Sequence, residues 1–234
     1  MQTGLLFNGL ICLIVAGVSF WISRIILKER VKTFAEFMVL GFWLSVGLTW
    51  LLVGAGLFLY EGGYPFYDKI MNRYGVQALI YLQLSFGVAY AVYRAYSKWL
   101  VGMVVLLACL AFSAVGYSFL ILPGGFLFGS DSYFSVEYLL NPVSWKFFQI
   151  ILGIGVIFLI YDILRNLITR LKKKHFRSVY FYTSLSILVY AVIGFFDNQG
   201  FNATWIMVLF RSIIVLSVLL TYLTYSRDKT LEEK

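Results

Sequence analysis

Seven long apolar runs dominate this sequence, and they constrain its fold more than any other feature. A helix needs about 20 mostly apolar residues to cross the hydrocarbon core of a membrane. The runs are Leu5–Leu27, Phe34–Leu59, Gly75–Tyr96, Trp99–Leu122, Trp145–Ile168, Val179–Phe196 and Ala203–Tyr225. They are continuous rather than alternating, which favours helices over the strands of a membrane β-barrel. The sequence therefore predicts an all-α, polytopic membrane protein, in which residues 1–234 form one seven-transmembrane-helix bundle.

Composition excludes the common alternatives. Apolar residues make up 61% of the chain and charged residues 13%, whereas soluble domains contain about 45–50% and about 25%. The first run has no basic residue before it and is followed by Arg24, Lys28, Arg30 and Lys32, which is the reverse of a signal peptide. We therefore expect it to be a retained helix with a translocated N-terminus.

Basic residues predict the orientation of the bundle. With the N-terminus outside, segments 24–33, 94–98, 165–178 and the tail from 226 would be cytoplasmic, and they hold 15 of the 19 lysine and arginine residues. Short cytoplasmic loops are enriched in such residues. We therefore expect an integral protein of a bacterial plasma (inner) membrane with a cytoplasmic C-terminus. The net charge of +8 follows from this bias and indicates no nucleic-acid partner.

Two segments outside the runs carry interpretable patterns. The Arg170–Arg177 segment is strongly basic and could contact anionic lipid headgroups or a cytoplasmic partner. Residues 123–144 form the longest loop, which is expected to be extracytoplasmic and is rich in aromatic residues. This loop predicts either a short interfacial helix or a lid packed over the bundle.

The chemistry that the sequence lacks is informative. The single histidine, His175, lies in the basic segment, so paired haem ligands and a histidine-rich zinc site are excluded. The last run contains no lysine for a retinal Schiff base. The sequence therefore predicts no cofactor, no metal and no catalytic residue, and it favours a protein that is not an enzyme.

Polar residues inside the runs are the candidate ligand-binding residues, because ionisable groups are costly in a bilayer. Arg211 lies inside the last run. It could pair with Asp197 to lock a helical hairpin, or anchor an anionic or carbonyl group from outside. Gln83 and Tyr90, together with Tyr190 and Gln149, could line a cavity that opens toward Arg211 or simply bond neighbouring helices.

Four charged residues near the predicted inner ends of the runs form another group: Asp162, Arg165, Arg94 and Glu36. Asp162 and Arg165 are three residues apart, so they could pair on one helical face. Glu36 could join Arg94. These pairs are either structural or an inner gate that breaks on opening. Trp43 and Trp50 share one face of the second run and could face lipid or wall a pocket.

Three functions remain open. We expect a non-catalytic seven-helix protein that binds a small molecule from the extracytoplasmic side, as a transporter or a sensor. The alternative is an integral subunit of a larger membrane complex, which would add membrane protein subunits to the lipid bilayer as partners. A lipid-modifying membrane enzyme is the third, and it would use Asp162, Glu36 and Arg94 near the inner headgroups.

Overall fold

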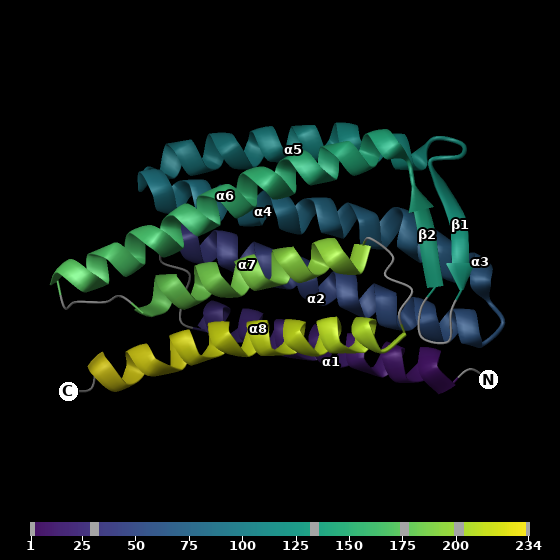
Figure 1. The fold of residues 1–234 in the computed structure, drawn as a ribbon, viewed down its shortest axis with the longest axis horizontal. Coiled ribbons are helices and arrows are strands. Elements are labelled where there is room, and N and C mark those ends of the chain that lie inside the picture. Colours follow the sequence, from purple (N-terminus) through teal and green to yellow (C-terminus); the bar gives the residue numbers. More distant parts are fainter. Residues whose placement is uncertain (1–2, 29–32, 132–135, 174–177, 199–203, 233–234) are drawn as a thin grey trace.

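The structure, a computed structural model, describes residues 3–28, 33–131, 136–173, 178–198 and 204–232, and within them the fold is predominantly helical (Figure 1). The long helices are α1 (Thr3–Lys28), α2 (Phe34–Glu61), α4 (Gln77–Tyr96), α5 (Trp99–Ile121), α6 (Pro142–Lys173), α7 (Ser178–Asn198) and α8 (Thr204–Glu232). A short helix α3 (Pro65–Ile70) and a π-helical turn η1 (Met71–Val76) lead directly into α4. Strands β1 (Phe126–Asp131) and β2 (Val136–Leu140) form an antiparallel hairpin.

Five helical segments are long and apolar enough to cross a membrane: Gly4–Lys28, Phe34–Glu61, Pro65–Tyr96, Trp99–Ile121 and Pro142–Ile168. In the described parts of α7 and α8 the apolar stretches are shorter, Tyr180–Phe196 and Leu209–Tyr222. These lengths indicate a helical membrane protein. The sixth and seventh spans, and the orientation of the bundle, stay predictions.

Local sequence sets where α2 begins, and where α2 gives way to α3. At the start of α2, Thr33 Oγ1 accepts the backbone N–H of Glu36 at 3.2 Å, and the Glu36 carboxylate accepts the backbone N–H of Thr33 at 2.8 Å. This reciprocal capping box satisfies two donors that the helix leaves open. After α2, Gly63 adopts a φ of 86°, which a residue without a Cβ does at little cost. Pro65 then occupies the first turn of α3. The third apolar helical segment therefore runs from Pro65 to Tyr96, whereas the sequence predicted that it begins at Gly75.

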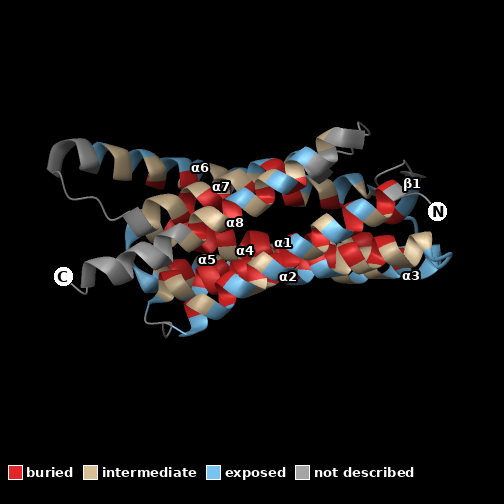
Figure 2. Cartoon of the chain, turned by 90° about the horizontal axis from the view of Figure 1, so that it is seen from below, coloured by how far each residue is buried: buried red, intermediate tan, exposed pale blue. Residues whose placement is uncertain are grey.

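Six helices close into a ring, and α5 lies outside it. Helix α1 packs against α2 and α8, and the ring continues through α2–α4, α4–α6, α6–α7 and α7–α8 contacts. Helix α5 packs against α4 and α6. Buried residues line the inner sides of the helices, as Figure 2 shows. Large apolar side chains such as Leu107 and Ile157 stay exposed on the outer faces of α5 and α6, which suits contact with lipid.

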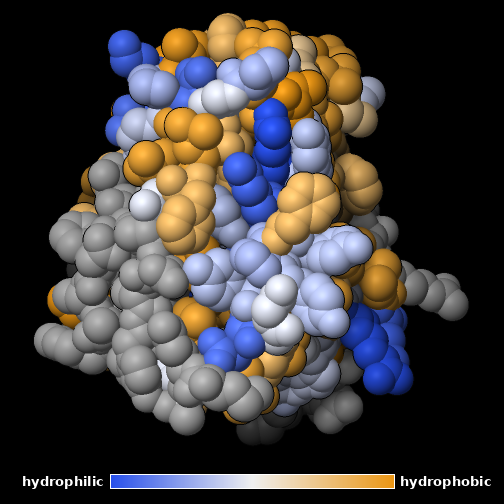
Figure 3. All heavy atoms as spheres, turned by 90° about the vertical axis from the view of Figure 1, so that its right-hand side faces the viewer, coloured by the Kyte–Doolittle hydropathy of each residue, from blue (hydrophilic) through white to orange (hydrophobic). Residues whose placement is uncertain are grey.

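The two ends of the bundle differ. The start of α1, the turn between α2 and α3, and the β-hairpin lie together at one end, here called the hairpin end (Figure 1). Figure 3 shows this end, where hydrophilic side chains lie among hydrophobic ones. The last residues of α4 and α6 lie at the opposite end, here called the tail end.

The aromatic loop forms a hairpin rather than the short interfacial helix that was one of the two alternatives. Phe126 pairs with Leu140 and Phe128 with Tyr138, and a bulge follows Phe128. Burial alternates along β2, where Leu139 is exposed between the less exposed Tyr138 and Leu140. This period of two suits a strand and not a helix. The Phe126 and Tyr138 rings stack with centroids 4.7 Å apart.

Candidate functional site

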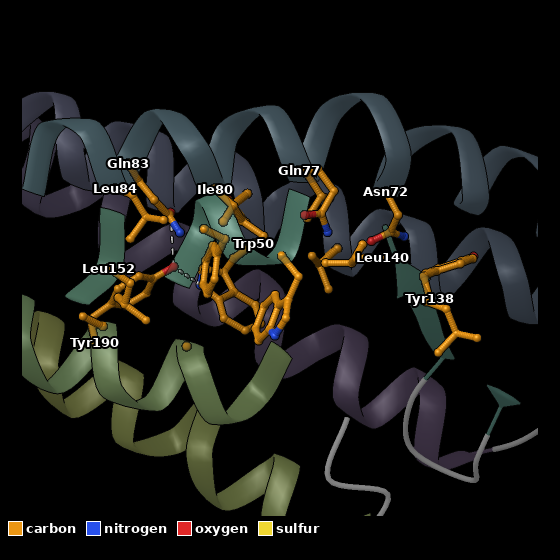
Figure 4. A pocket seen from close by; sticks show the side chains of 18 of the residues that line it. Trp50, Asn72, Gln77, Ile80, Gln83, Leu84, Tyr138, Leu140, Leu152 and Tyr190 are labelled. Carbon is orange, nitrogen blue, oxygen red and sulfur yellow. Dashed lines mark hydrogen bonds between the residues drawn. The ribbon is translucent and has the colours of Figure 1, made fainter. Parts of the chain in front are cut away.

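A cavity of about 420 Å³ lies inside the helix ring, beneath β2 (Figure 4). Residues of α2, η1, α4, β2, α6, α7 and α8 line it. Small-molecule sites in proteins are mostly apolar clefts of about 300–1,000 Å³ with a few polar groups. The apolar walls of this cavity include Val53, Ile80, Leu84, Trp145, Phe148 and Leu152.

The end of the cavity farthest from the hairpin, here called the floor, carries a relay of three polar side chains. Trp50 Nε1 donates a hydrogen bond to Tyr190 Oη at 3.3 Å, and Tyr190 Oη donates to Gln83 Oε1 at 3.2 Å. Figure 4 shows the three side chains turned toward one another from α2, α7 and α4. Each is at most 5% exposed, so neighbouring atoms hold the relay in place.

A buried cation lies beside this relay. Arg211 of α8 is 5% exposed and lines the same cavity. Its Cζ lies 5.1 Å from the centroid of the Trp50 ring, within the range of a cation–π interaction. Its Nη1 donates to Asn8 Oδ1, and to Cys12 Sγ at 3.1 Å. Helix α1 therefore helps to position the guanidinium at the floor.

Near the hairpin, the cavity adjoins a hydrogen-bonded cluster of Asp68, Asn72 and Tyr138, here called the latch, of which Asn72 and Tyr138 line the cavity. Tyr138 Oη donates to Asp68 Oδ2, and Asn72 Nδ2 donates to Asp68 Oδ1 at 2.8 Å. Asp68 is only 1% exposed. It fits there because Gly56 of α2 has no Cβ, and a Cβ at this position would overlap Asp68 Oδ1. The latch fastens β2 to the helix that precedes α4.

The latch keeps its phenolic proton at neutral pH. Burial first, and then the hydrogen bond to Asp68 and the negative charge of that carboxylate, raise the pKa of Tyr138 above its ordinary value of 10.0. The phenol therefore stays a donor, as the hydrogen bond to the carboxylate requires.

A second buried polar cluster, here called the tail cluster, lies on the tail side of the floor. Arg94 Nη2 lies 3.4 Å from Asp162 Oδ1, and Ser184 Oγ donates to Asp162 Oδ2 at 2.6 Å. The hydroxyls of Tyr90 and Ser184 are 3.3 Å apart. The Arg94 guanidinium also lies 3.9 Å from the centroid of the Tyr180 ring. These contacts join α4, α6 and α7 between the cavity and the tail end.

The structure brings together some of the predicted ligand-binding residues. Gln83, Tyr190 and Arg211 line one cavity. Tyr90 is fully buried in the tail cluster instead, and Gln149 is exposed on α6, away from the cavity lining. The side chain of Asp197 lies outside the described residues, so its pair with Arg211 stays a prediction.

The predicted inner ion pairs take a different arrangement. Asp162 of α6 pairs with Arg94 of the neighbouring helix α4 rather than with Arg165 of its own helix, because Asp162 is buried and Arg165 is exposed. Arg165 Nη1 donates to the backbone carbonyls of Arg94 at 3.3 Å and Ala95 at 3.1 Å. Glu36, expected near Arg94, takes part in the capping box of α2. The side chains of 170–177 lie outside the described residues.

Several residues of the latch and of the cavity lining were not predicted from the sequence. Asp68 and Asn72 are four residues apart and bond within one helical segment, whereas Tyr138 comes from the 123–144 loop and meets Asp68 only through the fold of the hairpin. Gln77 of α4 also lines the cavity and was not singled out. Its position at the start of a polar-rich helix was the available signal. For Trp50, the structure selects the pocket wall over the lipid-facing alternative.

The described lining combines apolar side chains with neutral polar groups and one guanidinium. Among the described residues, no carboxylate, histidine or cysteine lines the cavity. The described part of the chain also contains no group of three or more His, Cys, Asp or Glu residues that could hold a metal ion. No protein-family model, curated protein or solved structure matches the chain.

Proposed function

We propose that this chain is a non-catalytic seven-span membrane protein that binds a small molecule from the extracytoplasmic side, as a transporter or a sensor. The amphipathic cavity beneath the hairpin carries the proposal. It combines apolar walls with the Trp50–Tyr190–Gln83 relay and the buried guanidinium of Arg211. A buried cation within a membrane helix typically marks a ligand or ion pathway.

The proposal places the hairpin end outside and the tail end in the cytoplasm. Lys28, Arg94, Lys98 and Arg165 lie at or near the ends of α1, α4 and α6 that reach the tail end. An excess of lysine and arginine on one side is the usual mark of the cytoplasmic face. This orientation makes the hairpin an extracytoplasmic cover and the latch its fastening.

The transporter and the sensor differ at the tail cluster. A transporter needs the Arg94–Asp162 contact to separate, so that the cavity opens toward the tail end. A sensor keeps this contact and passes ligand occupancy to a cytoplasmic partner. Uptake of a bound probe into proteoliposomes that contain only the purified protein distinguishes the two, because a sensor alone moves no solute.

A side chain that fills the cavity tests the site itself. Gly194 of α7 lines the cavity, and a Cβ there meets nothing within 4 Å. Gly153 of α6 has equally open surroundings but is exposed outside the ring. Any probe from a panel of short acids, amides and amines that raises the Tm of the wild type should lose this effect in Gly194→Phe and keep it in Gly153→Phe. Equal stabilisation of both variants would place the site elsewhere.

The contribution of the cation has its own test. Arg211→Leu should abolish the ligand response while the protein stays folded and inserted. If Arg211→Leu and Asp197→Asn both fail to insert, Arg211 serves a structural ion pair instead. Circular dichroism and size-exclusion chromatography of the purified variants separate these results.

One observation favours a second candidate, an integral subunit of a larger membrane complex. Helix α5 leaves an apolar face exposed, on which Val104, Leu107 and Val115 are each at least half exposed. Either lipid or a partner subunit would cover it. Stoichiometric co-purification of another membrane protein from native membranes would support this candidate. A lipid-modifying enzyme has less support, because Asp162 and Glu36 take part in separate contacts.

A further inference from the structure

We propose that the ligand is a single-chain amphiphile whose carboxylate binds at the floor and whose apolar body of medium length lies along the cavity walls. This inference rests on the proposed function, since it names the chemical class that the same cavity selects. Three features of the lining carry it: the donors at the floor, a buried amide along the wall, and the distribution of charge.

The floor leaves one donor group of the relay open to the cavity, the side-chain amide of Gln83. In the relay, each donor is directed at the next group, from the Trp50 N–H to the Tyr190 hydroxyl and on to the Gln83 carbonyl oxygen. The Gln83 amide nitrogen, with two N–H groups, makes no hydrogen bond to any described residue, although Gln83 is only 5% exposed. This nitrogen is not among the fully buried unpaired atoms, so it is accessible from the cavity that Gln83 lines. An acceptor oxygen of a ligand would satisfy this donor.

Gln77 repeats this situation nearer the hairpin. It is 8% exposed, lines the cavity, and its side-chain amide makes no hydrogen bond within the described part of the chain. Figure 4 shows it on the cavity side of α4, between Gln83 and Asn72. Six residues of helix separate Gln77 from Gln83, which is about 9 Å at 1.5 Å per residue. The cavity therefore offers polar groups at separate depths.

The walls between these polar groups are apolar, and the volume of the cavity limits the size of the ligand. Ile80 and Leu84 of α4 and Phe148 and Leu152 of α6 all line it. The floor at Gln83 and the latch at Asn72 are eleven residues apart along one continuous helix, or about 16 Å. A volume of about 420 Å³ holds one chain of medium length and excludes a two-chain membrane lipid.

The charge of the described lining selects the sign of the ligand. Arg211 is the only charged residue among the described residues that line the cavity. A carboxylate there would meet the guanidinium and the Gln83 amide together, and charge-assisted hydrogen bonds of this kind are stronger than neutral ones. An ammonium group at the floor would meet the like charge of Arg211. We therefore expect the cavity to prefer an acid over the amine of the same length.

Equilibrium binding of radiolabelled decanoate to the full-length protein in nanodiscs tests this inference, with decanamide and decylamine as competitors. Decanoate should compete best, decanamide less well, and decylamine at least tenfold more weakly than decanoate. Gln83→Leu should weaken decanoate binding about tenfold, because one charge-assisted hydrogen bond is lost. The same change at exposed Gln149 should leave the Kd unchanged. Gln77→Leu should leave the decanoate affinity nearly unchanged, because Gln77 lies about 9 Å along α4 from Gln83. If Gln83→Leu fails to fold, the order in which the three probes compete still tests the carboxylate assignment.

The outcomes separate the ligand class from the site. Equal competition by decylamine, or unchanged decanoate affinity in Gln83→Leu, overturns the carboxylate assignment. If Gly194→Phe still blocks the competing probe in that case, the cavity remains the binding site and only the ligand class is wrong. If no probe binds, or if Gly194→Phe alters none of the binding, both the ligand class and the proposed function are overturned.

Discussion

Removing one hydroxyl from the latch should loosen the hairpin without unfolding the bundle. Tyr138→Phe deletes the donor to Asp68 Oδ2 and keeps the ring that stacks on Phe126. Asp68 then retains the Asn72 amide as its remaining latch partner, at 2.8 Å. The helix ring itself loses no contact, so the effect should stay within the hairpin.

The expected size follows from the burial of the acceptor. Hydrogen bonds to charged groups contribute about 1.5–3 kcal/mol, and more is lost when the acceptor is left buried. Asp68 is 1% exposed and Tyr138 is half-buried, so we expect the closed hairpin to lose about 2 kcal/mol. Since each 1.4 kcal/mol corresponds to a factor of ten, the open fraction of the hairpin should rise roughly thirtyfold.

Hydrogen–deuterium exchange measures this open fraction directly. Exchange of the ladder amides of β1 and β2 reports local opening, whereas amides inside α4 report opening of the bundle. We expect the ladder amides to exchange roughly thirtyfold faster in Tyr138→Phe, and the α4 amides to be unchanged. Tyr67→Phe is the matched control, because Tyr67 is exposed in α3 and its hydroxyl makes no hydrogen bond to a described residue.

Two results would refute this reasoning. Unchanged ladder exchange in Tyr138→Phe would mean that the hydroxyl does not fasten the hairpin. An equal increase in α4 would mean that the hairpin and the bundle open as one unit, and the latch would then not be a local fastening.

Three further predictions follow from the same contacts. Arg94→Met should cost about 3 kcal/mol, because Asp162, which is 1% exposed, is left uncompensated. Asp162→Leu should cost less, because the Arg94 side chain is 18% exposed, and the double variant should recover most of the Tm in thermal unfolding. Gly56→Ala should accelerate hairpin exchange, since its Cβ would displace the latch carboxylate, while Gly17→Ala, which meets nothing within 4 Å, should not. The raised pKa of Tyr138 keeps the contribution of its neutral form intact below its ordinary value of 10.0. Hairpin exchange, corrected for intrinsic rates, should therefore be flat from neutral pH up to that value and faster above it.

The helices could be predicted from the sequence because each apolar run satisfies a length requirement that no other fold shares. The polar residues at the floor of the cavity were predictable in part for the same reason. Gln83, Tyr190 and Arg211 interrupt apolar runs, and a bilayer makes such interruptions visible. Their meeting in one cavity depends on how α4, α7 and α8 pack, which the periodicity of a single helix does not contain.

The latch and the tail cluster could not be predicted in the same way. Asp68 and Tyr138 are distant in sequence, and their contact depends on a hairpin register that a bulge alters. Asp162 has a basic neighbour three residues along its own helix, which local spacing favours. The packing of α6 against α4 turns the carboxylate toward Arg94 instead. In both cases tertiary geometry overrode a local preference.

The π-helical turn η1 lets α3 and α4 differ in helical phase, although they belong to one continuous helical segment. A π-helix closes its hydrogen bonds over one more residue than an α-helix, and each residue of an α-helix turns about 100°. Removing one residue from Met71–Val76 would therefore change the helical phase of α3 by about that angle and leave α4 in place. Asp68 would turn away from the hairpin while Gln83 kept its partners. A single insertion or deletion in this turn could therefore reorient Asp68 relative to the hairpin without altering the floor of the cavity.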